Sequence, residues 1–228
     1  MEPIAALIPI KDHSERVPGK NFRPLLDAPL WEHIVRTLSA VPRIEKIFID
    51  TDSKRFTQEV LAPYPKVEII ERPEHLRGDF VSTNKLFAHD LSVIDPRFRV
   101  FLQTHTTNPL LTAATVQDMI GKFEAAAAAA EKHDSLFTVT AYFARFYQRD
   151  GSAVNHDPKV LLRTQDLAPL LEENSNLYLF TRDSFAATNA RIGARPLLFE
   201  MDRLEATDID DQETWELAEA LMSRRGRA

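Results

Sequence analysis

The sequence contains no cysteine and only 6 glycines in 228 residues, where average usage of about 7% would give roughly 16 glycines. Without cysteine there is no disulfide, no thiolate nucleophile and no Cys-ligated zinc or iron–sulfur site, which fits a reducing compartment. The glycines lie far apart along the chain, so neither G-x-G-x-x-G nor G-x-x-x-x-G-K-[ST] can be written. A Rossmann dehydrogenase and a P-loop ATPase are therefore disfavoured.

Long apolar runs and an excess of basic residues are also missing. The apolar stretch Ile4–Ile8 is too short for a membrane span, and Met1-Glu2-Pro3 lacks the basic region of a signal peptide. The 28 basic and 34 acidic residues give a net charge of −6, which argues against a nucleic-acid partner. With 44% hydrophobic residues, we expect one cytoplasmic domain over residues 1–228, with no membrane partner.

Short apolar runs alternate with helical patterns through most of the chain, which is typical of βαβ units on a mainly parallel sheet. We therefore predict an α/β fold of Rossmann-like type. The predicted strands cover residues 4–8, 44–49, 67–70, 100–102, 135–140, 176–181 and 197–200. The predicted helices cover residues 30–41, 54–62, 82–94, 112–132 and 211–222, followed by a frayed tail at 223–227.

Residues 142–173 interrupt this alternation. The segment is rich in aromatic, charged and turn-forming residues, with one short strand candidate at 160–162. It is predicted to be an insertion or a lid on the single domain.

A cluster of cations follows the first predicted strand. In open α/β sheets, ligands bind beyond the carboxyl ends of the strands. The loop at residues 9–21 lies at such an end, and its cations with the next one along are Lys11, Arg16, Lys20 and Arg23. Arg and Lys are charge-assisted donors to phosphate oxygens, so the loop is a candidate polyphosphate site. The alternative is a solvated surface loop.

Seven segments in order resemble one family. The loop Pro9–Asn21 is similar to P-A-R-G-G-S-K-x-x-P-x-K-N of the CMP-sialic acid synthetases (acylneuraminate cytidylyltransferases). The other six similar segments are Asp50–Ser53, Glu71–Asp79, Leu102–Gln103, Arg163–Asp166, Asn174–Phe180 and Asp208–Asp210. The chain departs from the family pattern at Lys11, Asp12, His13, Glu15 and Leu111, and Gln103 is followed by a longer loop. These departures indicate a divergent branch.

The resemblance implies a nucleotidyltransferase fold and a cytidylyltransferase activity. In such a reaction the anomeric hydroxyl of a 2-keto-3-deoxy sugar acid attacks the α-phosphate of CTP and gives a CMP-sugar and pyrophosphate. Phosphoryl transfer depends mainly on positioning and on neutralising charge. By resemblance, the nucleotide-binding residues are Lys11, Ser14, Arg16, Lys20 and Asn21, with Arg72 on the cytidine side.

Asp208 and Asp210 are the candidate metal ligands. Two carboxylates at i and i+2 in extended chain point to one side and offer hard oxygens to Mg²⁺, the expected cofactor. Together with Lys20 they are the candidate catalytic residues. The alternative is that Asp210 and Glu213 form a capping box for the last helix, with Asp211 serving the helix dipole.

Polar residues after the strand at 100–102 suit a sugar-binding loop. They are Gln103, Thr104, Thr106 and Asn108, although the same residues also suit turn formation and helix entry. The resemblance adds Arg163, Gln165 and Asn176 as sugar contacts. His13 and His105 are candidate bases, because histidine titrates near neutrality, or they are solvated loop residues.

The resemblance also implies a homodimer in which residues 142–173 reach the partner subunit. The aromatic residues Tyr142, Phe143, Phe146 and Tyr147 suit the core of an interface; the alternative is that they cover the chain's own sheet. Two other functions stay open: transfer of another nucleotide or to another sugar, and a nucleotide- or sugar-binding regulator without turnover.

Overall fold

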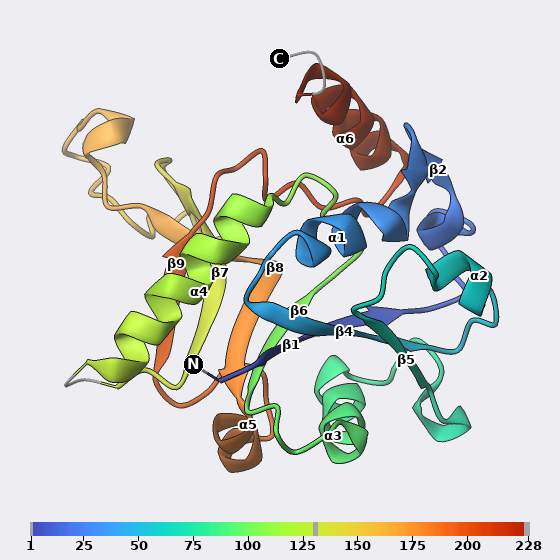
Figure 1. The fold of residues 1–228 in the computed structure, drawn as a ribbon. Coiled ribbons are helices and arrows are strands. Elements are labelled where there is room, and N and C mark those ends of the chain that lie inside the picture. The colour runs from blue at the N-terminus through green and yellow to red at the C-terminus, as the bar shows by residue number, and fades with distance from the viewer. Residues whose placement is uncertain (1, 130–131, 226–228) are drawn as a thin grey trace.

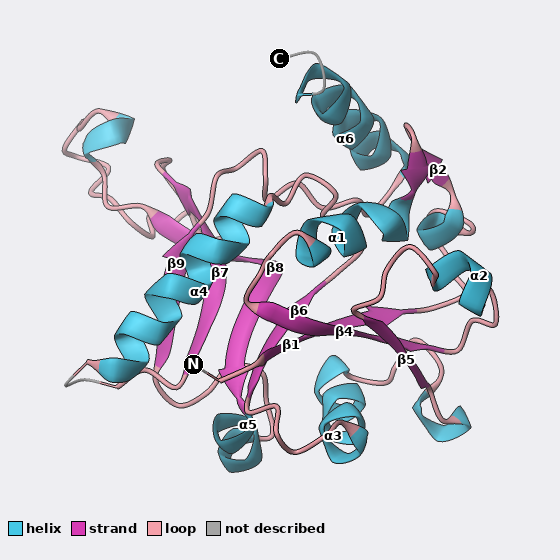
Figure 2. Cartoon of the chain, viewed as in Figure 1, coloured by secondary structure: helices cyan, strands magenta, loops and turns pink. Residues whose placement is uncertain are grey.

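The computed structural model describes residues 2–129 and 132–225. Its centre is a seven-stranded sheet in the order β5-β4-β1-β6-β8-β7-β9, flanked by helices (Figures 1 and 2). The strands are β1 (Ile4–Ile10), β4 (Ile44–Thr51), β5 (Val67–Glu71), β6 (Val100–Thr104), β7 (Ser135–Tyr142), β8 (Leu170–Thr181) and β9 (Pro196–Glu200). All neighbouring pairs are parallel except those of β8 with β6 and β7. The predicted α/β class with a mainly parallel sheet is therefore confirmed.

Two helices cover each face of the sheet. The helices are α1 (Leu30–Ser39), α2 (Gln58–Leu61), α3 (Thr83–Val93), α4 (Ala113–Ala128), α5 (Arg182–Thr188) and α6 (Gln212–Arg225). Figure 1 shows α1 and α4 on one face of the sheet and α3 and α5 on the other. The buried side chains divide in the same way: those of α1 and α4 form one apolar cluster with the sheet, and those of α3 and α5 form a second.

Burial explains why these segments take their forms. β1 lies between β4 and β6 and is covered on both faces, so its side chains are nearly all buried and its sequence is a continuous apolar run. In α1 the buried residues Leu30, Ile34, Val35 and Leu38 recur at helical spacing and form one apolar stripe after Pro29.

Several element boundaries differ from the prediction. Residues 160–162 are not a strand, β8 begins at Leu170 instead of residue 176, and the helix predicted at 54–62 is only Gln58–Leu61. α4 ends at Ala128, and residues 130–131 lie outside the described residues. α6 continues to Arg225 instead of ending at residue 222, and residues 226–228 lie outside the described part.

The sequence patterns missed several short elements, among them one helix and one hairpin. The helix is α5, whose capping box joins Thr181 to Ser184, so the Glu or Gln that usually marks this motif is absent. The hairpin consists of β2 (Pro24–Leu25) and β3 (Ala28–Pro29). Elements this short carry too few residues for a periodic signal.

The segment 142–173 projects from the sheet. β7 and β8 pair as far as Tyr142 and Leu170, and the chain between them, which includes the 3-10 helix η3 (Thr164–Asp166), extends beyond the sheet edge (Figure 1). We call residues 142–173 the arm. Phe143 and Tyr147 are about half exposed, at 50% and 53%. Tyr142 and Phe146 are less exposed and pack edge-to-face against each other, so both interpretations of these aromatic residues stay open. Among the described residues, no helix is both long and apolar enough to cross a membrane.

Candidate nucleotide-binding site

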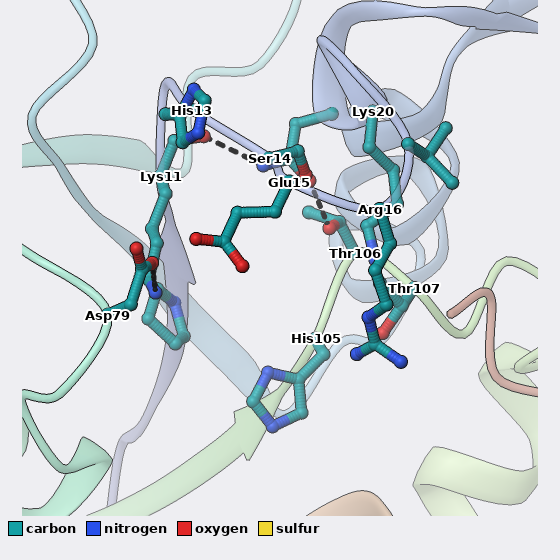
Figure 3. Close-up of a pocket in the computed structure, with 13 residues that line it drawn as sticks. Lys11, His13, Ser14, Glu15, Arg16, Lys20, Asp79, His105, Thr106 and Thr107 are labelled. Carbon is teal, nitrogen blue, oxygen red and sulfur yellow. Dashed lines mark hydrogen bonds and ion pairs between the residues drawn. The ribbon is translucent and has the colours of Figure 1, made fainter. Parts of the chain in front are cut away.

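A polar pocket lies beyond the carboxyl ends of β1 and β6. One wall is the loop after β1, and the other is the chain that follows β6, with Asp79 at one side (Figure 3). The lining residues are Pro9, Lys11, His13, Ser14, Glu15, Arg16, Val17, Lys20, Asn21, Asp79, His105, Thr106 and Thr107. Five of the six predicted nucleotide-binding residues, namely Lys11, Ser14, Arg16, Lys20 and Asn21, thus line one pocket.

Asn21 braces the loop that forms this pocket. Its Nδ2 donates to the backbone oxygen of Lys11 at 2.8 Å, and its Oδ1 accepts from Thr106 Oγ1 at 2.6 Å. Asn21 and Thr106 are both buried. Both ends of the Asn21 amide are therefore engaged, and the bonds fix the loop against the chain after β6.

Asp12 ties the same loop to the end of β4. Its backbone N–H donates to Asp52 Oδ1 at 2.9 Å, and its side-chain Oδ1 accepts from Ser53 Oγ at 2.6 Å. The resembled family has glycine at this position. The departure at Asp12 thus replaces a flexible residue with a side chain that anchors the loop.

The loop cations are held by exchangeable partners. Lys11 Nζ lies 2.8 Å from Asp79 Oδ1, and Arg16 Nη2 lies 2.7 Å from Asp210 Oδ1. Both pairs are open to solvent, with 41% to 67% of each side chain exposed, and such an ion pair contributes at most about 1 kcal/mol. A polyphosphate can therefore replace these carboxylates at little cost.

Lys20 is the more enclosed cation. Its Nζ donates to the backbone oxygen of Ile209 at 2.7 Å. Burial lowers the pKa of Lys20, while the charges of Asp208 and Asp210 act in the opposite direction. Lys20 thus links the pocket to the segment that carries the two candidate metal ligands.

Asp208 and Asp210 flank Ile209, whose backbone N–H donates to Thr107 O at 2.9 Å. Burial raises the pKa of Asp208, and the nearby Asp210 carboxylate raises it further. A bound cation would relieve this repulsion. Within residues 2–129 and 132–225, no group of three or more acidic or histidine side chains could hold a metal by itself. The donor set fits an Mg²⁺ ion that completes its shell with water and phosphate oxygens.

The cap of α6 is formed by a different aspartate. Asp211 Oδ1 accepts from the backbone N–H of Thr214 at 2.8 Å, and the N–H of Asp211 donates to Thr214 Oγ1 at 3.0 Å. The alternative pairing of Asp210 with Glu213 as a capping box is therefore wrong. Asp210 is left for another role.

Arg72 lies outside the pocket. Its side chain is buried, with Nε 3.0 Å from Asp50 Oδ1 and Nη2 donating to the Asp50 backbone oxygen at 3.0 Å. In this structure Arg72 joins the ends of β4 and β5. Its assignment to the cytidine side remains a prediction.

Asp90 lies near this ion pair and gives a stability prediction. It is buried, and neither carboxylate oxygen has a hydrogen-bond partner within the described residues. Burial, with repulsion from Asp50, raises the pKa of Asp90 to about 8. The unfolded chain releases this proton above about pH 4, so the folded protein binds it more tightly and its stability falls as the pH rises from about 4 to about 8.

We therefore expect Asp90→Asn to remove this part of the pH dependence, which amounts to at most about 1.4 kcal/mol per pH unit. The measurement is the free energy of urea unfolding from pH 5 to pH 8 for both proteins. Parallel pH profiles would contradict the assignment of a protonated, buried Asp90.

The predicted sugar-binding residues are only partly brought together. Thr106 lines the pocket, whereas Gln103 and Thr104 are fully buried behind it. Asn176 is also buried and donates from Nδ2 to the Glu205 backbone oxygen at 3.1 Å. Asn108 is buried next to the segment before Asp208. None of these four buried residues lines the pocket.

Two further predicted sugar contacts lie on the arm. Arg163 Nε is 2.7 Å from Asp166 Oδ2, and Gln165 is exposed in η3. Neither lines the pocket of its own chain. Their contact with a sugar remains a prediction.

Both candidate histidines line the pocket. His105 is partly buried, and burial, with the charges of Arg191 and Lys20, lowers its pKa to about 4. Arg191, which contacts the residue behind His105, was missed by the sequence patterns. It lies in a loop far along the chain, and no local spacing marks it.

The sheet is mainly parallel, and a cationic loop lies beyond the carboxyl ends of its strands. Two carboxylates lie beside Lys20, the most enclosed cation of that loop. A nucleotidyltransferase needs these parts. The chain belongs to the cytidylyltransferase family, whose sequence model matches residues 5–222. The family predicted from the seven segments is confirmed.

Curated relatives are similar at low identity. The N-acylneuraminate cytidylyltransferase of Escherichia coli O18:K1:H7 is 23% identical over 98% of this chain, which spans only 53% of that protein. The CMP-N,N'-diacetyllegionaminic acid synthase of Legionella pneumophila is 25% identical over 96% of both chains. The post-translational flagellin modification protein B of Campylobacter coli is 23% identical over 99% of this chain and 97% of its own length.

Solved structures share the fold. A CMP:2-keto-3-deoxy-manno-octonic acid synthetase complexed with CTP superposes with a TM-score of 0.69 at 16% identity, covering 98% of this chain and 99% of its own. The 4-diphosphocytidyl-2C-methyl-D-erythritol synthase of Anaerococcus prevotii gives 0.69 at 13% identity, covering 97% and 96%. At these identities the likeness concerns the fold.

Proposed function

We propose that the protein is an Mg²⁺-dependent cytidylyltransferase that transfers CMP from CTP to a 2-keto-3-deoxy sugar acid of eight or nine carbons, and releases pyrophosphate. The observation that carries the proposal is the bond from Lys20 to Ile209, which joins the cationic loop to the carboxylates of Asp208 and Asp210. The sugar class is supported by the names of the relatives, which include synthases of CMP-linked sugar acids.

In the proposed reaction the anomeric hydroxyl of the sugar acid attacks the α-phosphate and loses its proton to water, while the bond from the α-phosphorus to the bridging oxygen breaks and pyrophosphate leaves. Lys11, Arg16 and Lys20 neutralise the phosphate charges and align the triphosphate in the pocket. Asp208 and Asp210 would hold the Mg²⁺, which supplies Lewis-acid stabilisation of the phosphate oxygens. Asn21 keeps the loop in place during this step.

A binding protein without turnover is the second candidate, and Glu15 favours it. This carboxylate lines the pocket where the resembled family has lysine, and it opposes the binding of a triphosphate. Arg16, next to it in the chain, restores a cation in the same pocket. The charge balance of the loop therefore still permits nucleotide binding.

A substrate screen separates these candidates. Each of the four ribonucleoside triphosphates is combined with Mg²⁺ and with sialic, legionaminic, pseudaminic or 3-deoxy-octulosonic acid, and pyrophosphate is measured. We expect release with CTP and at least one sugar acid. Release with another nucleotide alone contradicts the choice of CTP, and CTP binding without release from any sugar supports the regulator.

We further propose that the protein forms a homodimer through the arm. The arm carries exposed apolar residues at its tip, among them Leu161, which is 89% exposed, with Val160 and Leu162 beside it. Apolar side chains grouped on one projection are typical of an interface. Dimerisation would also carry Arg163 and Gln165 to the partner's pocket.

We expect Leu161→Asp to convert the dimer into a monomer, because it places a charge in an apolar contact. The measurement is sedimentation velocity, with Lys159→Asp, two residues away, as a control for added negative charge. If the wild-type chain is already monomeric at micromolar concentration, or if both variants remain dimeric, the proposed interface is wrong.

A further inference from the structure

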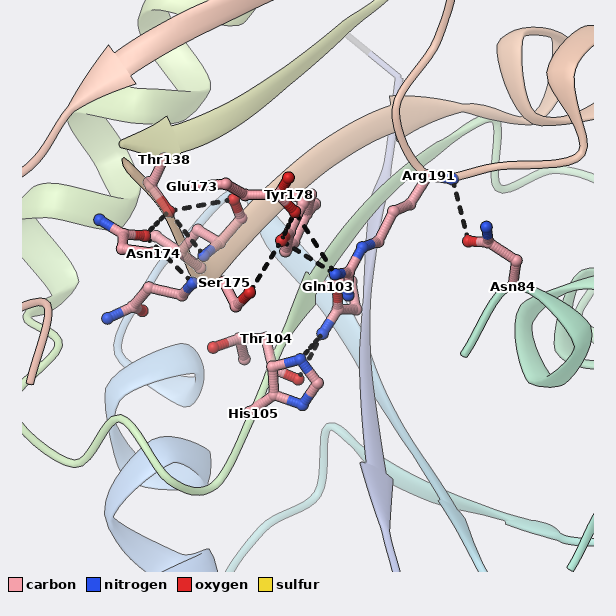
Figure 4. A network of polar contacts seen from close by, with 12 residues as sticks. Asn84, Gln103, Thr104, His105, Thr138, Glu173, Asn174, Ser175, Tyr178 and Arg191 are labelled. Carbon is pink, nitrogen blue, oxygen red and sulfur yellow. Dashed lines mark hydrogen bonds and ion pairs between the residues drawn. The ribbon is translucent and has the colours of Figure 1, made fainter. Parts of the chain in front are cut away.

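Both the oxygen and the nitrogen of the Gln103 side-chain amide are hydrogen-bonded within the protein. Its Oε1 accepts from Arg191 Nη1 at 2.8 Å, and its Nε2 is 3.1 Å from the Thr104 backbone oxygen and 2.9 Å from His105 Nε2 (Figure 4). Gln103 is fully buried and does not line the pocket, whereas His105 does. The residue that meets a ligand at this place is therefore His105.

Arg191 is held firmly enough to orient this amide. Its Nη2 donates to the Tyr178 hydroxyl at 2.9 Å, and its guanidinium lies 3.6 Å from the centroid of the Tyr178 ring. Glu173 Oε1 is 3.7 Å from the same Nη2. Only 18% of the Arg191 side chain is exposed. These contacts leave the guanidinium one position, in which it faces Gln103.

The two successive hydrogen bonds, from Arg191 to Gln103 and from Gln103 to His105, fix the tautomer of His105. A guanidinium can only donate, so the atom of Gln103 that faces Arg191 is the oxygen and the atom that faces His105 is the NH₂ group. That group also only donates, so His105 Nε2 accepts and carries no proton. The proton of the neutral ring is then on Nδ1, which has no hydrogen-bond partner within the described residues.

We propose that Arg191 is a positioning residue that acts through Gln103 to hold His105 as a neutral Nδ1–H donor, and that this donor binds an acceptor oxygen of the sugar acid. The identity of the ligand rests on the proposed function; the tautomer does not. A ring that accepts at Nε2 and donates at Nδ1 has no free lone pair, so His105 is a binding group and not a general base.

The charges around His105 agree with a neutral ring. Lys20 and Arg191 are the cations whose charges act on the ring, and Arg16 lines the same pocket, where the opposing charges are Glu15 and Asp79. Protonation of the ring would place a further positive charge beside these cations, which is unfavourable, and the pKa of His105 is accordingly low. The donor therefore persists across the physiological pH range.

The first test reads the tautomer directly. Nitrogen-15 NMR of histidine-labelled protein is expected to show His105 Nε2 unprotonated and Nδ1 protonated from pH 6 to pH 8. Arg191→Met should release the amide of Gln103 and give a mixture of tautomers, and Gln103→Glu should move the proton to Nε2. Arg195→Met, an exposed arginine nearby, is the control and should leave the wild-type spectrum. A ring protonated at Nε2 in the wild-type protein overturns the proposal.

The second test locates the ligand. His105→Leu should raise the KM for the sugar acid by about tenfold to a hundredfold, since a lost donor to a bound polar group costs about 1.5–3 kcal/mol, and should affect KM more than kcat. His105→Asn, whose amide can donate from a similar place, should recover most of the loss. A rise confined to the KM for CTP, or none, contradicts the sugar assignment. If no substrate turns over, the proposed function fails, and the NMR result still decides the role of Arg191.

Discussion

Lys20→Ala is expected to lower the rate of pyrophosphate release by about a hundredfold to a thousandfold, the cost of removing one preorganised donor from developing charge. Lys20 Nζ is the cation that bonds to the segment of Asp208 and Asp210, at 2.7 Å from Ile209 O. Its partial burial strengthens its interaction with a phosphate oxygen relative to a solvated lysine. The measurement is kcat under saturating CTP and sugar acid, with the urea midpoint as a check on folding.

The matched control is Lys122→Ala. Lys122 lies on α4 and pairs with Asp118 in an exposed i,i+4 contact, so its removal should leave kcat unchanged. Lys20→Arg should retain more activity than Lys20→Ala, because it keeps the charge. Equal rates for Lys20→Ala and the wild-type protein would show that Lys20 only braces Ile209.

Asp208→Asn is expected to abolish Mg²⁺-dependent turnover while leaving the fold intact. The substitution keeps the size of the side chain and removes the charge that the metal requires. The segment itself is held by the buried Ile209 and by its backbone bond to Thr107 at 2.9 Å, so the fold does not depend on the carboxylate. The measurement is the initial rate over a series of Mg²⁺ concentrations.

Asp211→Asn is the control for this change. Asp211 is three residues away, and asparagine can keep its cap on Thr214, so the Mg²⁺ dependence should be that of the wild-type protein. If Asp208→Asn turned over normally and Asp211→Asn did not, the assignment of the metal ligands would be wrong.

The fold could be predicted from the sequence because buried positions require apolar residues, which recur at the spacing of each helix or strand. The apolar run of β1 and the helical spacing in α1 gave both elements, and the loop between them was identified as a site from its position and its cations. Boundaries failed where a short cap or a local pairing decides the end of an element, as in α5 and at the start of β8.

The side of the pocket that is formed by the chain after β6 could not be predicted in the same way. Gln103 and His105 are two residues apart, and both are polar, so composition did not separate the residue behind the pocket from the residue in it. That distinction depends on Arg191, which approaches from the loop after α5. Contacts between distant segments leave no local pattern, and the buried pair of Arg72 with Asp50 was missed for the same reason.

The departures from the family pattern have a structural meaning at one position. Asp12 stands where the family has glycine, and it bonds to Asp52 and Ser53. The loop is thereby anchored through side chains, which agrees with the scarcity of glycine in the whole sequence. The pocket of this chain is therefore lined by cationic side chains on an anchored loop.

Transfer of CMP in this pocket is tested by sugar-dependent release of pyrophosphate from CTP in the presence of Mg²⁺, followed by phosphorus-31 NMR. We expect one pyrophosphate and one CMP-sugar for each CTP consumed, no release without the sugar acid, and none after chelation of the metal. If CTP binds to the protein but stays intact with every sugar acid of the panel, the protein is not a cytidylyltransferase for these sugar acids.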